Sequence, residues 1–299
     1  MAISGRVTES SIHTRVLANL QRNLAKGDKI QDQLSSGKQI NRPSDSPTGT
    51  VSSMQLRTES RANERYLRNA DDGLGWLSTV ESTLTSTSDL ITRARDLTVQ
   101  GLNSGVNSAQ VNAALATEID QIRDSLISYA NTKYLDRPVF GGTTGGPVAY
   151  DSNGEYVGDK GETMRTVNAG SPVRVDTRGP EAFGEDDSDT QLFKVLGSIS
   201  KSLKSGDSAQ LTTDLNNLDK AGISVRTAIS EVGARYNRVT QMKDAAADRV
   251  LSVTAQLSDI EDIDLPKTIM EMQLQQTSYQ AALAASAKVI QPSLIDFLR

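Results

Sequence analysis

Residues 211–260 read LTTDLNNLDKAGISVRTAISEVGARYNRVTQMKDAAADRVLSVTAQLSDI, and apolar or small residues recur along them in alternating steps of four and three, with Lys243 as the exception. A repeat of 3.5 residues keeps one stripe of a helix against a partner helix and is typical of a coiled coil. At 1.5 Å per residue, this helix would be about 75 Å long, so we expect an elongated helical bundle. The stripe consists of Leu211, Leu215, Leu218, Gly222, Val225, Ile229, Val232, Tyr236, Val239, Lys243, Ala246, Val250, Val253, Leu257 and Ile260.

The composition also favours thin layers of helices. Aromatic residues supply much of a thick core, yet the 299 residues include only four Phe, seven Tyr and one Trp. The net charge of −5 and the lack of a basic patch argue against a nucleic-acid partner. The absence of cysteine excludes disulfides and thiolate sites. Neither a signal peptide nor an apolar run of about 18 residues is present, so we expect no membrane span and either a cytoplasmic protein or export by another route.

Proline positions divide the chain into helical and non-helical parts. No proline occurs in 48–137 or 181–265, which leaves both stretches free to form long helices. The segment 138–187 holds four of the eight prolines and ten of the 22 glycines. Within it, Asn153-Gly154 predicts a β-hairpin, and Val173–Val175 alternates like a short strand. We therefore predict a mainly α fold, an elongated helical bundle or coiled coil built from the N- and C-terminal segments, with a small β insert.

Three domains are expected. Residues 1–45 and 262–299 would be terminal helices, 46–137 and 188–261 a helical rod, and 138–187 a small β-rich surface domain. The terminal stripes contain Gln, Ser and Thr, and two such helices alone are marginally stable, so we expect them to become ordered on assembly with neighbouring copies. Opposite charges favour their pairing: residues 1–42 carry seven Lys and Arg against three acids, and 256–299 carry six acids against three Lys and Arg.

No complete catalytic, cofactor or metal motif is found in the sequence. His13 is the single histidine, so no second one exists for a metal pair or a catalytic triad. Gly37-Lys38-Gln39 lacks the Ser or Thr and the upstream Gly of a phosphate loop. The run from Asp151 to Glu155 resembles part of a calcium loop without its closing Glu, so a hairpin turn is favoured. The acidic residues in 181–189 are read as a solvated loop, with calcium or a basic partner as the minor alternative.

Two motifs at opposite ends carry a family resemblance. Residues 34–47, LSSGKQINRPSDSP, resemble the N-terminal motif of the flagellin family. Residues 274–286, LQQTSYQAALAAS, and 290–298, IQPSLIDFL, resemble the flagellin C-terminus. Within this family the chain is most similar to the branch at the hook–filament junction, the type 3 hook-associated proteins. The Arg42–Pro47 loop, Phe140–Thr143 and Tyr156–Asp159 carry that finer likeness, while Arg137–Val139 and Pro266 depart from the family pattern.

The resemblance implies a structural subunit of the bacterial flagellum and no enzyme or cofactor. It would form an adaptor ring that joins hook to filament, after unfolded export through the flagellar type III channel guided by an uncleaved N-terminal signal. Implied partners are other copies, a hook-associated junction protein on the hook side, junction, flagellin or cap subunits on the filament side, and a cytoplasmic chaperone at the C-terminal segment. The protein would be extracellular after a transient cytoplasmic stage. Subunit packing is assigned to Leu17, Leu20, Leu24, Leu34, Ile40, Pro43, Ile269, Met272, Tyr279, Leu283, Ile290, Leu294 and Phe297.

Three alternatives stay open at this point. A short filament flagellin would differ from a junction protein in copy number, thousands against about one ring. An enzyme on a helical scaffold has no residue motif in its favour. A secreted binding module would use 138–187 as an adhesin-like head, and that segment alone would have to bind a ligand.

Overall fold

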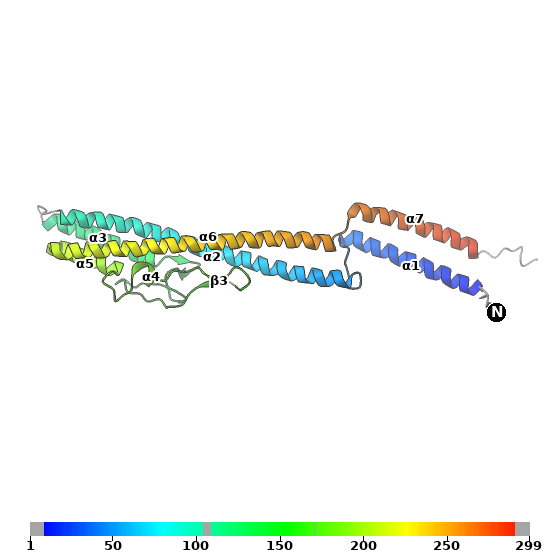
Figure 1. Cartoon of the computed structure of the whole chain (residues 1–299), viewed down its shortest axis with the longest axis horizontal. Helices are drawn as coiled ribbons and strands as arrows, with labels where there is room; N and C mark the ends of the chain where they lie inside the picture. Colours follow the sequence, from blue (N-terminus) through cyan, green and yellow to red (C-terminus); the bar gives the residue numbers. More distant parts are fainter. Residues whose placement is uncertain (1–8, 104–108, 171, 291–299) are drawn as a thin grey trace, which may run out of the picture. The chain divides into compact units, whose positions relative to one another are not determined.

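The computed structural model describes residues 9–103, 109–170 and 172–290, with the backbone alone at 9–13 and 288–290. Over these residues it contains seven helices and four short strands, which confirms the predicted mainly α fold (Figure 1). The chain divides into two compact units. The terminal unit comprises residues 1–61 and 251–299, and the core unit comprises residues 62–250.

The terminal unit is built around the helices α1 (Glu9–Ser36) and α7 (Leu265–Ile290). It also includes the first turns of α2 (Pro47–Leu102) and the last turns of α6 (Ser208–Glu261). The helix α1 stops before Gly37, which adopts the left-handed φ of 69° that suits glycine at a helix C-terminus. Asp264 caps the start of α7, because its carboxylate accepts a 3.1 Å hydrogen bond from the Lys267 N–H.

The helices α1 and α7 lie side by side and run antiparallel (Figure 1). The Ile263 N–H donates to the Gly37 carbonyl at 3.1 Å, and Gln275 Nε2 donates to the Asn23 carbonyl at 2.7 Å. Buried and half-buried side chains define a seam between the two helices with the alternating spacing of a coiled coil. On α1 the seam consists of Val16, Leu20, Asn23, Gly27, Ile30 and Leu34, and on α7 it consists of Thr268, Met272, Gln275, Tyr279, Ala282 and Ser286.

The α7 seam includes only some of the α7 residues that the sequence analysis assigned to packing. Met272 and Tyr279 lie in it as expected, but Ile269 and Leu283 lie one residue outside it, and both are 43% exposed. The other α7 seam positions, apart from Met272 and Tyr279, are occupied by small or polar residues. Such side chains let two helices approach closely, so the bulkier Ile and Leu remain on the flank.

The core unit combines α2 and α6 with α3 (Ala109–Ala130) and α5 (Leu192–Ser205) around one hydrophobic cluster. The α6 stripe is buried or half-buried at all fifteen predicted positions, which confirms the predicted packing stripe. This holds both for the part of α6 in the core unit and for its last turns in the terminal unit. Within the core unit, ion pairs Arg95–Asp219 at 2.8 Å and Lys243–Asp71 at 2.7 Å connect α2 with α6. The largest fully buried side chains of these four helices are Trp76, Leu77 and Leu84 from α2, Ile119 and Leu126 from α3, and Leu192, Phe193, Leu196 and Ile199 from α5.

The middle segment contains less β structure than predicted. Its elements are β1 (Lys133–Tyr134), β2 (Arg137–Pro138), β3 (Met164–Thr166), β4 (Pro172–Arg174) and the short helix α4 (Gly179–Phe183). The strands form two antiparallel pairs, β1 with β2 and β3 with β4. The hairpin predicted at Asn153-Gly154 consists of one bridge, between Tyr150 and Tyr156. The strand predicted near Val173 is confirmed as β4, whereas α4 was not predicted.

Aromatic packing, rather than a sheet, holds the middle segment to the helices. The ring of Tyr150 packs against Phe183 and Phe193, with centroids 5.7 and 5.0 Å away. Phe183 in turn packs against Phe140, with their centroids 5.0 Å apart. All four side chains are buried. Burial raises the pKa of the Tyr150 hydroxyl above its ordinary range. Three of the four Phe of the chain are therefore used at this one place.

Two neighbouring residues at the β1–β2 turn have a backbone conformation that side chains disfavour. Leu135 has a φ of 47° and Asp136 a φ of 62°, and they are the non-glycine residues with positive φ in the described part of the chain. Left-handed φ costs an L-residue roughly 1–2 kcal/mol. The Leu135 side chain is also 74% exposed, so the turn combines strain with an apolar tip.

Candidate functional site

The part of the chain that the structure describes contains neither a candidate metal site nor a candidate membrane span. No group of three or more His, Cys, Asp or Glu residues there could hold a metal ion. None of the helices over those residues is apolar and long enough to cross a membrane. Asp151 Oδ1 accepts hydrogen bonds from the N–H groups of Asn153 at 2.9 Å and Glu155 at 2.8 Å, which gives the hairpin turn favoured from the sequence.

The residues predicted for subunit packing fall into four groups. Half-buried members of the α1–α7 seam are Leu20, Leu34, Met272 and Tyr279. The exposed residues all lie outside the seam: Leu17, Leu24, Ile269, Leu283 and, in the loop after α1, Pro43. Ile40 is half-buried and lies over Gly49, where a Cβ would come within 2.7 Å of Ile40 Cδ1. The Ile290 side chain, Leu294 and Phe297 lie outside the described residues.

Four of the exposed residues share one side of the helix pair. Leu17 and Leu24 each follow a seam position of α1 by one residue, and Ile269 and Leu283 do the same on α7. In an antiparallel pair, positions displaced from the seam in this sense lie on the same side. We call these four residues the apolar flank.

The apolar flank leaves favourable burial unused within one chain. Its side chains are 58, 53, 43 and 43% exposed, in chain order. Burying a Leu or Ile completely contributes about 1.5–3 kcal/mol, so roughly half of that amount per residue is left for association, about 3–6 kcal/mol in all. Neighbouring exposed apolar residues on one face mark an interaction surface.

The buried carboxylate of Glu261 lies beside both the segment that follows α1 and the segment that precedes α7. The Glu261 side chain is 5% exposed and lies 3.1 Å from Lys38 Nζ and 2.7 Å from Arg57 Nη2. Beside it, the Gln39 N–H donates to the Glu261 carbonyl, and Lys38 forms a backbone bridge with Asp262. The opposite charges of the chain ends predicted pairing, and this contact confirms it, but the sequence pattern did not indicate Glu261 as its centre.

The ionisation of Glu261 is favoured by its cations. Burial alone would raise the pKa of this carboxyl, but hydrogen bonds from Arg57, Lys38 and Ser53 outweigh burial and hold the pKa below its ordinary value. The same contacts, led by a hydrogen bond to Asp262, raise the pKa of Lys38. Both groups are therefore charged at neutral pH.

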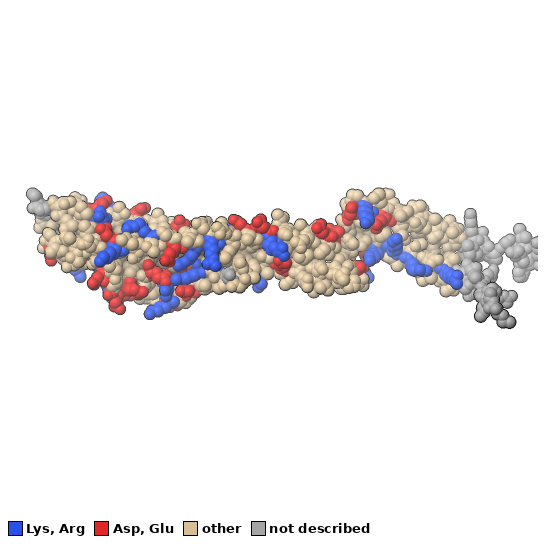
Figure 2. Space-filling view, in the orientation of Figure 1, with Lys and Arg blue, Asp and Glu red and all other residues tan. Residues whose placement is uncertain are grey.

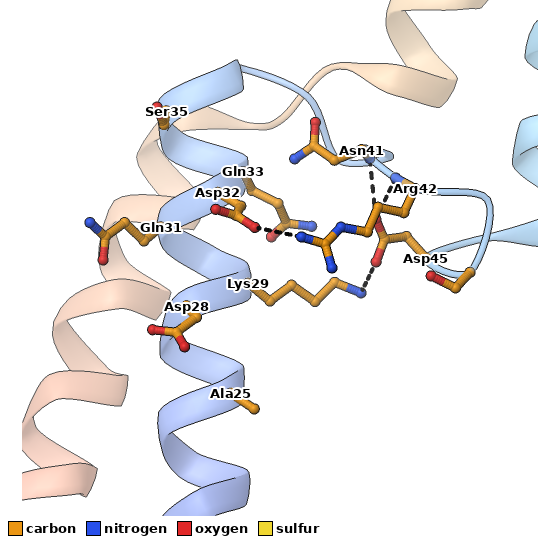
Figure 3. Close-up of a pocket in the computed structure, with 11 residues that line it drawn as sticks. Ala25, Asp28, Lys29, Gln31, Asp32, Gln33, Ser35, Asn41, Arg42 and Asp45 are labelled. Carbon is orange, nitrogen blue, oxygen red and sulfur yellow. Dashed lines mark hydrogen bonds and ion pairs between the residues drawn. The ribbon is translucent and has the colours of Figure 1, made fainter.

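A polar cleft of about 720 Å³ lies between α1 and the loop 41–45 (Figure 3). Lys29 Nζ reaches Asp45 Oδ1 at 3.0 Å, and Asp45 Oδ2 accepts hydrogen bonds from the N–H groups of Asn41 and Arg42 at 3.2 and 2.9 Å. The hydrogen bond from Lys29, followed by those from the backbone, lowers the pKa of Asp45. The loop is thus fixed as one wall of the cleft. Asp28 and Asp32 lie on the α1 wall.

Comparisons with known proteins agree with the geometry. The bacterial flagellin N-terminal helical region matches residues 8–143, and the bacterial flagellin C-terminal helical region matches residues 215–298. The flagellar hook-associated protein 3 of Escherichia coli is 28% identical over 304 residues, covering 94% of this chain and 95% of that protein. The flagellin of Bacillus subtilis is 26% identical over 300 residues, covering 96% of both chains.

A solved structure supports the same assignment. The crystal structure of Bacillus cereus FlgL is 25% identical, with a TM-score of 0.60, and the match covers 68% of this chain and 99% of that one. The two flagellin regions together cover well over half of the sequence, including both ends. The chain belongs to the bacterial flagellin family.

Proposed function

We propose that this chain is a structural subunit of the bacterial flagellum that forms the adaptor ring between hook and filament. The observation that carries the proposal is the apolar flank on a helix pair whose own seam contains Asn, Gln, Thr and Ser. Such a pair gains further apolar burial only when another copy covers the flank. Similarity along almost the whole length to hook-associated protein 3 of Escherichia coli supports the junction as the place.

The parts of the chain receive separate roles in this proposal. Residues 1–45 and 262–299 assemble with neighbouring copies and become ordered there. Residues 46–137 and 188–261 form the rod, and 138–187 faces solvent. Leu17, Leu24, Ile269 and Leu283 contact other copies, whereas Leu20, Leu34, Met272 and Tyr279 support the seam within one chain. Ile40 and Pro43 shape the link after α1, and Ile290, Leu294 and Phe297 extend the assembly surface.

We also propose the partners and the location that the family resemblance implies. The subunit contacts copies of itself, a hook-associated junction protein on one side, and junction, flagellin or cap subunits on the other. A cytoplasmic chaperone holds the C-terminal segment before type III export, and the mature protein is extracellular. No catalytic role is assigned.

A short filament flagellin is the second candidate, because the flagellin of Bacillus subtilis is nearly as similar over the same length. Antibodies raised against residues 138–187 distinguish the two. Electron microscopy of labelled cells should show a narrow band where hook meets filament. Label along the whole filament would instead identify a flagellin and overturn the junction role.

A further inference from the structure

We infer that the polar cleft of one copy receives Arg22 and Lys26 of a second copy, so that neighbouring copies associate side by side along α1. This inference rests on the proposed self-assembly and identifies one of its contacts. The cleft and both basic residues lie within the terminal unit.

The cleft offers two carboxylates that the described part of the chain leaves available. Asp28 has no ion-pair or hydrogen-bond partner among the described residues, and Asp32 has only Arg42 at 3.8 Å. The Asp32 side chain is 61% exposed. The remaining acid of the cleft, Asp45, is already occupied by Lys29 and by the loop backbone. Figure 3 shows Asp28 and Asp32 on the same stretch of α1, with Arg42 reaching Asp32 from the loop.

The incoming residues are equally available. Arg22 donates only to its own helix, to Asn19 Oδ1 at 2.6 Å and to the Ala18 carbonyl at 3.3 Å. Lys26 is exposed and has no partner within the described residues. Figure 2 shows basic side chains following one another along α1. Among the described basic residues of 1–42, only Lys38 forms ion pairs with acids of 256–299.

The two pairs match in spacing and oppose in charge. Arg22 and Lys26 are four residues apart, as are Asp28 and Asp32, so each pair covers about 6 Å of the helix. At 3.6 residues per turn, the two pairs lie about 120° apart around α1, on either side of the surface opposite α7. One helix cannot bring its own pairs together, but the basic side of one copy can meet the acidic side of the next.

A contact between two different sides of the same subunit is heterologous. Repetition of such a contact gives a ring if the rotation closes and a helical array if it does not. Exposed ion pairs of this kind set partner register and salt dependence, while the apolar flank supplies most of the affinity. The cleft therefore determines how copies are aligned along α1.

Charge reversal in the full chain tests the contact. Arg22→Glu/Lys26→Glu and Asp28→Lys/Asp32→Lys should each weaken self-association at least about tenfold in sedimentation velocity, because like charges then face each other. An equimolar mixture of the two variants should recover association, because one carries only acids and the other only bases at the contact. Lys201→Glu/Lys220→Glu, exposed residues of the core unit, changes the net charge as much as the first variant and should behave like the wild type.

Cysteine cross-linking gives a second readout, because the natural chain has no cysteine. In Arg22→Cys/Asp28→Cys, the two Cα atoms of one helix are about 10 Å apart, beyond the roughly 7 Å reach of a disulfide. Oxidation should therefore give a ladder of linked copies. Arg15→Cys/Arg22→Cys places both thiols on the basic side and should give none.

The outcomes separate this inference from the proposed function. If both charge-reversed variants associate as the wild type does, or if the two cysteine variants give the same ladder, the cleft contact is wrong, and self-assembly stands. If the wild type itself stays monomeric at every concentration, both the contact and the proposed self-assembly are overturned.

Discussion

Replacement of Leu283 by Asp should leave the monomer folded and abolish its self-association. Leu283 lies on the apolar flank, outside the α1–α7 seam, and is 43% exposed in the single chain. The exposed part of a Leu is worth about 0.6–1.3 kcal/mol when a partner buries it. An unpaired carboxylate buried in its place costs more than the roughly 1–3 kcal/mol of a neutral polar group.

These contributions together weaken each contact by about 2–4 kcal/mol, or about 30- to 1,000-fold in the dissociation constant. The monomer loses only the helix propensity of Leu, about 0.5 kcal/mol. The far-UV circular dichroism of the monomer should thus stay unchanged while sedimentation velocity detects no oligomer. Ser278→Asp adds the same charge to the other flank of α7 and should associate normally. Equal association of the two variants would refute the role of the apolar flank.

Three further predictions concern stability. In the isolated monomer, amides of 1–40 and 265–299 should exchange faster with deuterium than those of 211–250, and equally slow exchange would contradict ordering on assembly. Glu261→Gln should destabilise the terminal unit by about 1–2 kcal/mol at neutral pH. Since the lowered pKa stabilises the fold only while Glu261 is ionised, melting curves of wild type and variant should converge as the pH falls below about 4.5; a constant difference would refute this. Leu135→Asn should raise the free energy of unfolding by about 1 kcal/mol, and with it the urea midpoint, because Asn tolerates positive φ. Leu135→Ala should raise neither.

The long helices and their ends could be predicted because their signals are local. The 3.5-residue repeat of 211–260 depends only on residues of one helix, and Gly37 and Asp264 act through their own backbone neighbours. The α7 seam was harder. Met272 and Tyr279 belong to both possible stripes, and the choice between Leu283 and Ala282 depends on how closely α1 approaches.

The middle segment was the least predictable part of the chain. Phe140, Tyr150, Phe183 and Phe193 are spread over more than 50 residues, and no local pattern indicates that their rings meet. The short helix α4 fits against this cluster through Phe183, so tertiary packing decided its conformation. The ion pairs of Glu261 could not be predicted from a local pattern either, since Arg57 and Lys38 lie 204 and 223 residues away in sequence.

The hydrogen bond between Gln275 and Asn23 also has a consequence for the order of folding. It joins residues 252 positions apart, and closing such a loop in an otherwise unfolded chain costs about 5 kcal/mol of entropy. Contacts between α2 and α6, such as Arg57 with Glu261, shorten that loop before the outer helices meet. The first and last helices should therefore be the last to pair during refolding and the first to separate on heating, and a chain shortened at either end loses the partner of the helix at the other.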